Sequence, residues 1–255
     1  MIKKLRLSLL TVSLLTTGLF AKADKSLVDE YMHISGAKIT IESMGEQITA
    51  SIQQSSMLYG ESVDAKKIAF LQEAFNGDEG IDIVTAYLTE NFDNKNIKEL
   101  ITYYQSPLGK KVTQAGIDAM NPNVQADMLR FMADLSTNPP SGERTAAIKT
   151  FVAQLELVAS VEDMFVEMLL FLNEEATKNK KLSTEQMEQF MGMMGNAFEQ
   201  QMFISSLYVY RDIENSELNS VIKFYKSDTG RDELKIVREA MTQMLKSGFS
   251  RALRK

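Results

Sequence analysis

An all-α fold, built as two tandem helical repeats that pack together, is predicted by three features of this 255-residue sequence. Glycine and proline, which most often interrupt helices, are scarce at 13 and 4 residues. Long runs of β-branched residues, which are typical of strands, are missing. Apolar residues instead recur every three or four positions, which is the spacing of one helix face.

The first 23 residues are predicted to be a signal peptide. Three basic residues precede a mostly apolar run over 7–20, and residues 21–23 form an Ala-Lys-Ala cleavage site. The apolar run is shorter than the roughly 20 residues that a membrane-spanning helix needs. We therefore expect a chain that begins near Asp24, has no transmembrane segment and is periplasmic or secreted in a Gram-negative bacterium.

Composition excludes several classes of function. The chain has no cysteine and a single histidine, His33, so disulfides, thiol nucleophiles and sites with two imidazoles are excluded. It has 28 basic and 34 acidic residues, a net charge of −6, and the loss of four basic residues with the signal peptide leaves −10. An acidic chain repels nucleic acid, so we do not expect that partner. No cofactor is expected either.

Two long helices are predicted, each near the start of one half of the chain. Their apolar stripes are formed by Ile34, Ala37, Ile41, Met44, Ile48 and Ile52, and by Phe151, Leu155, Val158, Phe165, Leu169 and Leu172. Capping residues predict further helix starts after Asn94, after Ser106 at Pro107, and after Asn121 at Pro122.

The strongest break is the segment Ser-Thr-Asn-Pro-Pro-Ser-Gly at 136–142. It predicts a first helical repeat over 24–137, a Pro/Gly linker over 138–142 and a second helical repeat over 143–255. The last helix is expected to bury one apolar face and to end in basic residues, which suit the negative end of a helix dipole.

The two halves resemble each other at a fixed offset of 121 residues. Residues 81–120 and 202–241 share nine identical pairs in 40, whereas average composition gives roughly two or three. The identities include Tyr104 with Tyr225, Ser106 with Ser227, and Gly109 with Gly230. An apolar periodicity does not produce tyrosine, serine and glycine identities, so we interpret them as an internal repeat.

Each predicted copy centres on a helix-corner-helix unit. One helix ends in an aromatic pair, Tyr103-Tyr104 or Phe224-Tyr225, and a serine two residues later caps the next helix. That helix begins with proline in the first copy and with aspartate in the second. Gly109 and Gly230 are third in it, where the lack of a side chain lets the preceding helix approach closely.

At these corners the chain resembles a family of exported bacterial proteins known as domain of unknown function 2059. The family signature is an aromatic-Tyr, Ser, Pro, Gly, Lys corner, which residues 103–110 (YYQSPLGK) fit. Residues 224–231 (FYKSDTGR) fit it with Asp228 in place of proline. The resemblance implies a secreted all-helical domain that is present twice. It implies no catalytic residue, because the family's activity is unassigned.

Candidate sites are few. Glu30 and His33 have the Glu-x-x-His spacing of di-iron helical bundles, but no second histidine exists to complete such a site, so no metal site is predicted. Carboxylates are plentiful and include Glu162. A hydrolase pair could lie among them, although most are expected to form solvated faces.

A methionine stripe is the other candidate. Met187, Met191, Met194 and Met202 lie on one face of a predicted helix. Such a stripe most often fills a helical core, and it can also line an adaptable partner groove or bind Cu(I) through its thioethers. All three interpretations stay open at this point.

The sequence favours an exported, non-catalytic binding or envelope-associated protein whose partner is a protein or an envelope component. We expect a groove between the halves. Its candidate lining residues are Tyr104, Gly109, Tyr225, Gly230, Met187, Met191, Met194 and Met202. Two alternatives are a hydrolase of envelope polymers that uses paired carboxylates and a periplasmic Cu(I)-binding protein.

Overall fold

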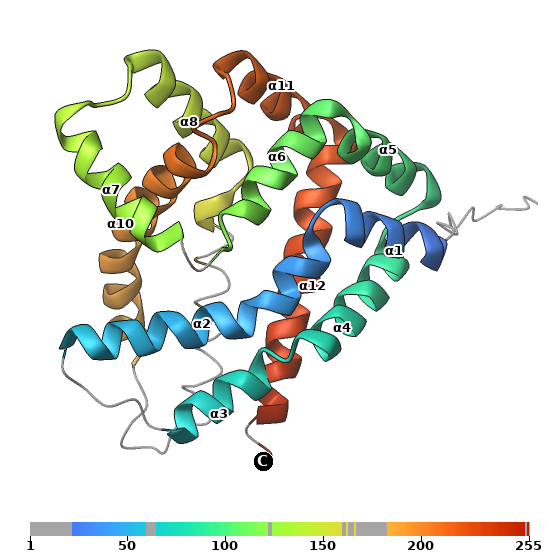
Figure 1. Ribbon diagram of the computed structural model, residues 1–255. Coiled ribbons are helices and arrows are strands. Elements are labelled where there is room, and N and C mark those ends of the chain that lie inside the picture. Colours follow the sequence, from blue (N-terminus) through green and yellow to red (C-terminus); the bar gives the residue numbers. More distant parts are fainter. Residues whose placement is uncertain are drawn as a thin grey trace, which may run out of the picture.

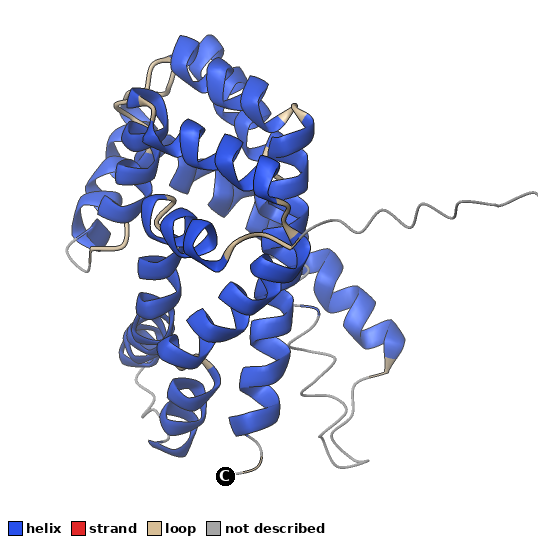
Figure 2. Ribbon diagram, turned by 90° about the vertical axis from the view of Figure 1, so that its right-hand side faces the viewer, coloured by secondary structure: helices blue, strands red, loops and turns tan. Residues whose placement is uncertain are grey.

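The computed structural model describes residues 22–59, 65–121, 124–159, 162, 166, 183–252 and 254. Within these ranges the regular structure is helical, and the one β-type contact is an isolated bridge between Lys22 and Asp93. Figure 2 shows the described helices joined by loops, with no strand among them. The predicted all-α class is confirmed. Residues 1–21, which hold most of the predicted signal peptide, lie outside the described part.

Five helices of the first half surround the C-terminal helix, α12 (Asp228–Ala252), which runs through the middle of the molecule (Figure 1). They are α1 (Lys25–Ile34), α2 (Ala37–Tyr59), α3 (Ala65–Ala74), α4 (Gly77–Asn91) and α5 (Asn94–Gln105). Five more described helices complete the fold. They are α6 (Pro107–Asp118), α7 (Val124–Thr137), α8 (Gly142–Gln154), α10 (Thr184–Val209) and α11 (Asn215–Tyr225).

The buried apolar residues form two clusters that do not follow the boundary between the halves. The first cluster is made by α1, α4 and α5 together with Met244, Leu245 and Phe249 of α12. The second is made mainly by α8 and α11, and Leu108 and Val112 of α6 pack against its edge. The helix that follows each corner therefore packs on the core of the other half.

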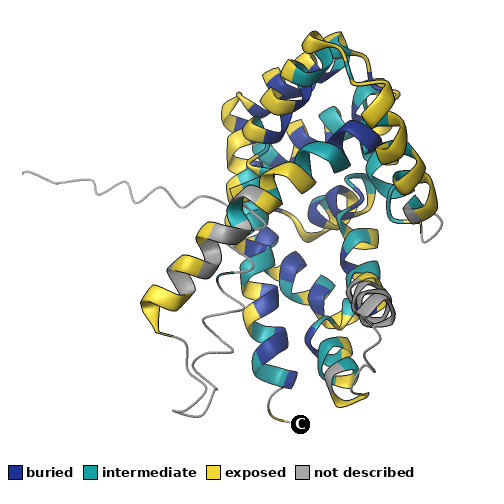
Figure 3. Cartoon of the chain, turned by 90° about the vertical axis from the view of Figure 1, so that its left-hand side faces the viewer, coloured by how far each residue is buried: buried dark blue, intermediate teal, exposed yellow. Residues whose placement is uncertain are grey.

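Glycine allows α12 to lie close to the first half. A Cβ at residue 248 would lie 1.9 Å from the carbonyl oxygen of Ala74, which is at the end of α3. Only glycine fits this backbone contact without a shift of one helix. Figure 3 shows buried residues along α12.

Several predicted boundaries are confirmed and others shift. Ser141 caps α8 by accepting a hydrogen bond from Arg144 N, so the predicted break at 136–142 is real. The predicted helix from Ile34 is interrupted at Ser35 and Gly36, because Gly36 has a φ of 78°. The helix predicted from Phe151 pauses at Glu156, whose φ is 50°, and most of its later residues lie outside the description.

Capping and burial also differ in detail. Asp93, not Asn94, caps α5, because its carboxylate accepts hydrogen bonds from two backbone N–H groups of the first turn. The last helix is predicted to bury a face with Leu234, Val237, Met241, Leu245 and Gly248: Leu245 and Gly248 are buried as expected, whereas Leu234, Val237 and Met241 are half-buried and Glu233, Ala240 and Met244 are buried instead.

Ala23, the last residue of the predicted signal peptide, is part of the fold. It is buried, and its N–H donates to the carbonyl oxygens of Thr89 (3.1 Å) and Phe92 (3.0 Å) at the end of α4. Cleavage after Ala23 would remove this donor. Among the described helices none is long and apolar enough to cross a membrane.

Candidate functional site

The two corners have the same local geometry. At the first, Ser106 Oγ donates to the Tyr103 carbonyl (2.6 Å) and accepts from Gly109 N (3.0 Å). At the second, Ser227 Oγ donates to the Phe224 carbonyl (2.6 Å) and accepts from Gly230 N (3.2 Å). Each serine therefore closes one helix and caps the next, as the sequence predicts.

Glycine is required at the third position of both corners. A Cβ at residue 109 would lie 2.2 Å from the Tyr103 carbonyl oxygen, and one at residue 230 would lie 2.5 Å from that of Phe224. Both contacts are to backbone, so a rotamer change cannot relieve them. The expected close approach of the preceding helix is confirmed for Gly109 and Gly230, both of which are buried.

The corners pack directly against each other. The rings of Tyr103 and Phe224 stack with centroids 3.6 Å apart and planes 2° apart. The hydroxyls of Tyr104 and Tyr225 are hydrogen-bonded at 2.9 Å. Each of these contacts joins two residues that are 121 positions apart, so the two corners meet across an approximate two-fold axis.

Two polar pairs beside the aromatic contact are related to each other by the same approximate two-fold symmetry. Lys111 Nζ donates to Glu217 Oε2 at 2.6 Å, and Asn96 Nδ2 donates to Asp232 Oδ2 at 3.0 Å. Because 111 matches 232 and 96 matches 217 at the 121-residue offset, the two pairs are equivalent. The hydrogen bond from Lys111 lowers the pKa of the Glu217 carboxyl.

Glu233 is the chemically unusual residue of this contact. Its carboxyl group is fully enclosed, and Oε1 accepts hydrogen bonds from Tyr31 Oη (2.6 Å) and Tyr104 Oη (2.6 Å). Its other oxygen, Oε2, has no hydrogen-bond partner among protein atoms. Burial raises the pKa of Glu233 to about 7, and the two phenol hydrogen bonds oppose that rise. The position that matches Glu233 in the first half is Val112.

The surrounding phenols are held in their neutral form. Burial and the neighbouring Glu233 raise the pKa values of Tyr31, Tyr104 and Tyr225 well above their usual range. The Tyr103 hydroxyl is buried without a hydrogen-bond partner. These groups hold α1, α5, α11 and α12 together. In this arrangement Tyr104 and Tyr225 contact each other and Glu233, and a ligand-binding role for them stays a prediction.

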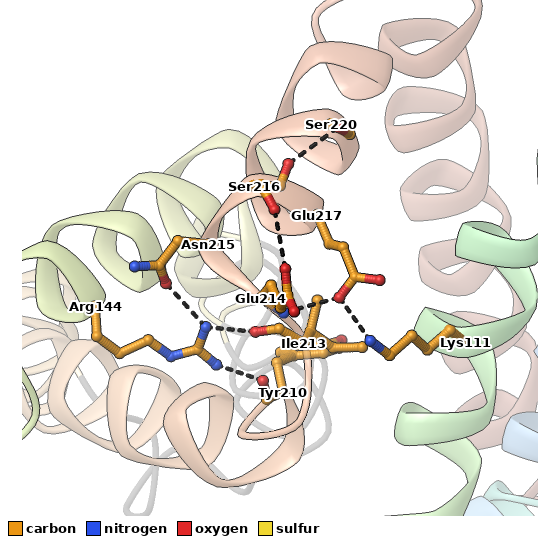
Figure 4. Close-up of polar contacts among 9 residues, drawn as sticks. All are labelled: Lys111, Arg144, Tyr210, Ile213, Glu214, Asn215, Ser216, Glu217 and Ser220. Atoms are coloured by element: carbon orange, nitrogen blue, oxygen red, sulfur yellow. Dashed lines mark hydrogen bonds and ion pairs between the residues drawn. The ribbon is translucent and has the colours of Figure 1, made fainter.

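A second polar centre fixes the turn between α10 and α11 (Figure 4). The Arg144 guanidinium donates to the carbonyl oxygens of Tyr210 and Ile213, the latter at 2.6 Å, and to Asn215 Oδ1 at 3.1 Å. Partial burial lowers the pKa of Arg144. Nothing in the sequence marked this role beyond a basic residue in the first turn of a helix.

The same three acceptors exist in the first half with other donors. Thr89 and Phe92, which match Tyr210 and Ile213 at the 121-residue offset, accept from Ala23 N. Asn94 Oδ1, which matches that of Asn215, accepts from Asp24 N at 2.8 Å. The identical asparagine therefore has the same role in both halves, and a backbone segment does in one half what a guanidinium does in the other.

Among the described residues, two large cavities lie outside the corner contact. One, of about 530 Å³, lies between α6, α7 and the end of α10, and its charged lining residues are Lys111, Asp118, Asp127, Arg211 and Asp212. The other, of about 820 Å³, lies between α8 and α10, and it is lined by Glu156, Glu162, Glu199 and Phe203 among others. Cations are mixed with the carboxylates of the first cavity.

The predicted methionine stripe is only partly described. The side chains of Met187, Met191 and Met194 lie outside the described set. Met202 is half-buried and packs against the second core cluster. The Cu(I) interpretation stays a prediction.

Other polar residues lie on the surface. His33 is exposed, and Glu30 accepts a hydrogen bond from Gln105. Asp78 and Glu79 lie in the first turn of α4, where negative charge suits the helix dipole. Over the described residues no group of three or more potential metal ligands is found.

Sequence reasoning missed Tyr31 and Glu233. A signal for Glu233 existed: it lies seven residues before Ala240 and eleven before Met244, on the stripe that α12 buries. A carboxylate on a buried stripe indicates either a partner or a raised pKa. No comparable signal marked Tyr31, because its partner is 202 residues away in the chain.

Residues 80–137 match the model of a family described as "Uncharacterized protein conserved in bacteria (DUF2059)". The match begins in α4, contains the first corner and ends with α7, and it supports the predicted family for this part of the chain. It does not include the second corner. No curated protein and no solved structure matches the chain.

Proposed function

We propose that this chain is an exported, non-catalytic protein of the bacterial cell envelope that binds another envelope protein. The observation that carries the proposal is on α7. Leu129 and Met132 are 64% and 42% exposed and lie one turn apart, whereas Phe131 and Leu135 of the same helix pack on the second core cluster. Large apolar side chains that are adjacent and exposed are typical of partner contacts.

The use of the buried polar groups supports a binding role over a catalytic one. Glu233 has a pKa near neutrality, which is a property of many catalytic acids. However, it is enclosed by tyrosines, and it lines neither of the two large cavities. A catalytic acid must reach a substrate, whereas Glu233 reaches only the residues that join the two corners.

The proposal includes the internal repeat. The second corner is a second copy of the first, because the serine, glycine and asparagine identities at the 121-residue offset make equivalent hydrogen bonds in the two halves. Duplication followed by packing of the two copies accounts for the approximate two-fold relation. Export places this protein in the periplasm, where its net charge of −10 favours partners that are not themselves strongly acidic.

The experiment is site-specific photocrosslinking in living cells. A photoreactive phenylalanine analogue replaces Leu129 in one variant and the exposed Lys98 of α5 in a control. We expect one adduct of defined mass at position 129, no adduct at 98, and loss of the adduct when Met132→Glu is added. Cell fractionation and N-terminal sequencing of the same sample report export and cleavage.

Two results would contradict the proposal separately. An uncleaved chain in the cytoplasm would contradict the proposed export. A cleaved periplasmic chain with no adduct at position 129, or with equal adducts at 129 and 98, removes the α7 contact.

A hydrolase is the second candidate, and the α8–α10 cavity favours it because Glu162 and Glu199 both line that cavity. Paired carboxylates are the chemistry of glycosidic bond cleavage. Release of soluble fragments from purified cell wall, abolished by Glu162→Gln and by Glu199→Gln but not by Glu143→Gln on the exposed start of α8, would establish it. If the unmodified protein releases no fragments, the hydrolase is excluded.

A further inference from the structure

Glu233 lies where four helices meet, and the described titratable groups that interact with it are phenols. Tyr31 of α1, Tyr104 of α5 and Tyr225 of α11 surround it, and Tyr103 of α5 is near enough for Glu233 to raise its pKa. The nearest acids on α5 and α12 have their own partners. Glu99 accepts from Thr229, and Asp232 accepts from Asn96. None of the ion pairs in the described part of the chain includes Glu233.

We propose that Glu233 is a proton-operated latch that holds α12 against both corners when its carboxyl group is neutral and loosens that contact when it ionises.

The physical reason is the absence of compensation for a buried charge. A carboxylate that leaves water needs a cation or a full set of hydrogen-bond donors. Glu233 has two phenol donors on Oε1 and none on Oε2. The neutral acid is therefore the form that fits this site, and burial raises its pKa to about 7.

The direction of the pH effect follows from the two states. In the unfolded chain Glu233 ionises near its ordinary pKa of 4.5, whereas in the folded protein it ionises near 7. Between these values the folded state keeps a proton that the unfolded state has lost, so stability falls as pH rises. Below pH 4.5 the contribution is fully present, and above pH 7 its loss is complete.

Because of where Glu233 lies, its ionisation weakens the packing between helices. α12 completes the first core cluster and begins at the second corner, so Glu233 stands between the two clusters. A charge at this point weakens the contacts of α12 with α1, α5 and α11 together. The expected motion is separation of the corners at neutral to alkaline pH, whether or not the protein is exported or binds a partner.

The test compares the purified protein with Glu233→Gln and with Glu239→Gln. Glu239 is a matched control, since it lies on the same helix and accepts a hydrogen bond from Tyr87 at 2.9 Å, but on the surface. Urea unfolding is measured from pH 4 to pH 8.5. Relative to Glu233→Gln, the unfolding constant of the unmodified protein should rise on the order of 300-fold over this range, since each pKa unit is worth a factor of ten.

Hydrogen exchange supplies the second measurement. Amides of α5, α11 and α12 should exchange faster at pH 8 than the intrinsic pH effect explains in the unmodified protein and in Glu239→Gln, and not in Glu233→Gln. Should Glu233→Gln fail to fold, Tyr31→Phe replaces it. Loss of this phenol removes a donor that lowers the pKa of Glu233, so the fall in stability should move to higher pH.

Either of two outcomes overturns the latch. One is a pH dependence of stability that is the same for the unmodified protein and Glu233→Gln. The other, where only Tyr31→Phe folds, is an unchanged pH midpoint.

Discussion

The turn between α4 and α5 and the turn between α10 and α11 present the same three acceptors to different donors. In the first half the backbone N–H groups of Ala23 and Asp24 occupy them, and in the second half a single guanidinium, Arg144, does so. The acceptors are a property of the turn, and most such groups in a partly buried turn are hydrogen-bonded. The donor can come from any segment that reaches them.

The helices that follow the two corners differ more. α6 has 12 residues and contributes half-buried side chains to the second cluster, whereas α12 has 25 residues and contributes fully buried ones to the first. The same local corner can thus start a short edge helix or a long central one. The length and apolar pattern of the residues after the corner decide which.

The largest expected effect comes from separating the halves. A chain of residues 22–137 lacks Met244, Leu245 and Phe249, whose burial is worth about 2 kcal/mol each, so the loss approaches the whole stability of a domain. We expect no cooperative thermal unfolding by circular dichroism. Residues 143–255 lose the same contacts of α12 and the half-buried contacts of α6, but they keep the second core cluster and should retain more structure. Cooperative melting of residues 22–137 alone at the temperature of the full chain would falsify the exchange of helices between the cores.

The corner glycines are expected to have the next largest effect. Gly109→Ala and Gly230→Ala each place a methyl group against a carbonyl oxygen, and each should lower the free energy of unfolding by about 2–3 kcal/mol. Gly116→Ala in α6 is the control, since no atom lies within 4 Å of its Cβ position, and it should stabilise by about 0.5–1 kcal/mol. Urea denaturation measures all three. Equal behaviour of Gly109→Ala and Gly116→Ala contradicts the close approach.

The third largest effect on stability is expected from loss of the Arg144 guanidinium. Arg144→Ala leaves two carbonyls and one asparagine oxygen without their donor, and we expect a loss of about 2 kcal/mol in the free energy of unfolding. Arg144→Lys keeps the charge but cannot reach all three acceptors. Its free energy of unfolding should therefore lie between those of Arg144→Ala and the unmodified protein. Asn94→Ala tests the matching acceptor in the first half. A neutral Arg144→Ala would show that water satisfies this turn.

The aromatic stack is expected to have the smallest effect. In a double-mutant cycle, Tyr103→Leu and Phe224→Leu should show a coupling energy of about 1 kcal/mol, because stacked rings contribute beyond their buried area. Tyr208→Leu, whose ring lies against Phe131 and not at the corners, is a suitable second partner for Tyr103→Leu. Coupling of the same size to both would mean that the effect is not specific to the corner contact.

Local features of this protein were predictable from sequence. Ser106 and Ser227 act on atoms within three residues of themselves, so the spacing alone identifies the caps and the glycines beside them. Gly36 broke a predicted helix, because an apolar stripe continues through a tight turn when the next helix packs on the same core. Periodicity alone does not report the positive φ of Gly36, which ends the first of the two helices.

Contacts between distant residues were not predictable in the same way. The bond from Tyr31 to Glu233 spans 202 residues, and no pattern in either segment refers to the other. In the sequence Glu233 is one of 34 acidic residues. Only the packing of α12 between the corners shows that tyrosines enclose it. Its raised pKa is a product of that placement, because the same side chain on the surface of α12 would remain hydrated.

The sequence by itself determined that the chain is helical, where it turns, and which residues close its two corners, since these depend on backbone hydrogen bonds over a few positions. Only the tertiary structure decided that each half lends a helix to the core of the other, that Tyr104 meets Tyr225, and that Glu233 is sealed between them. Packing of apolar faces is non-directional, so periodicity reports that a face is buried but not which face covers it.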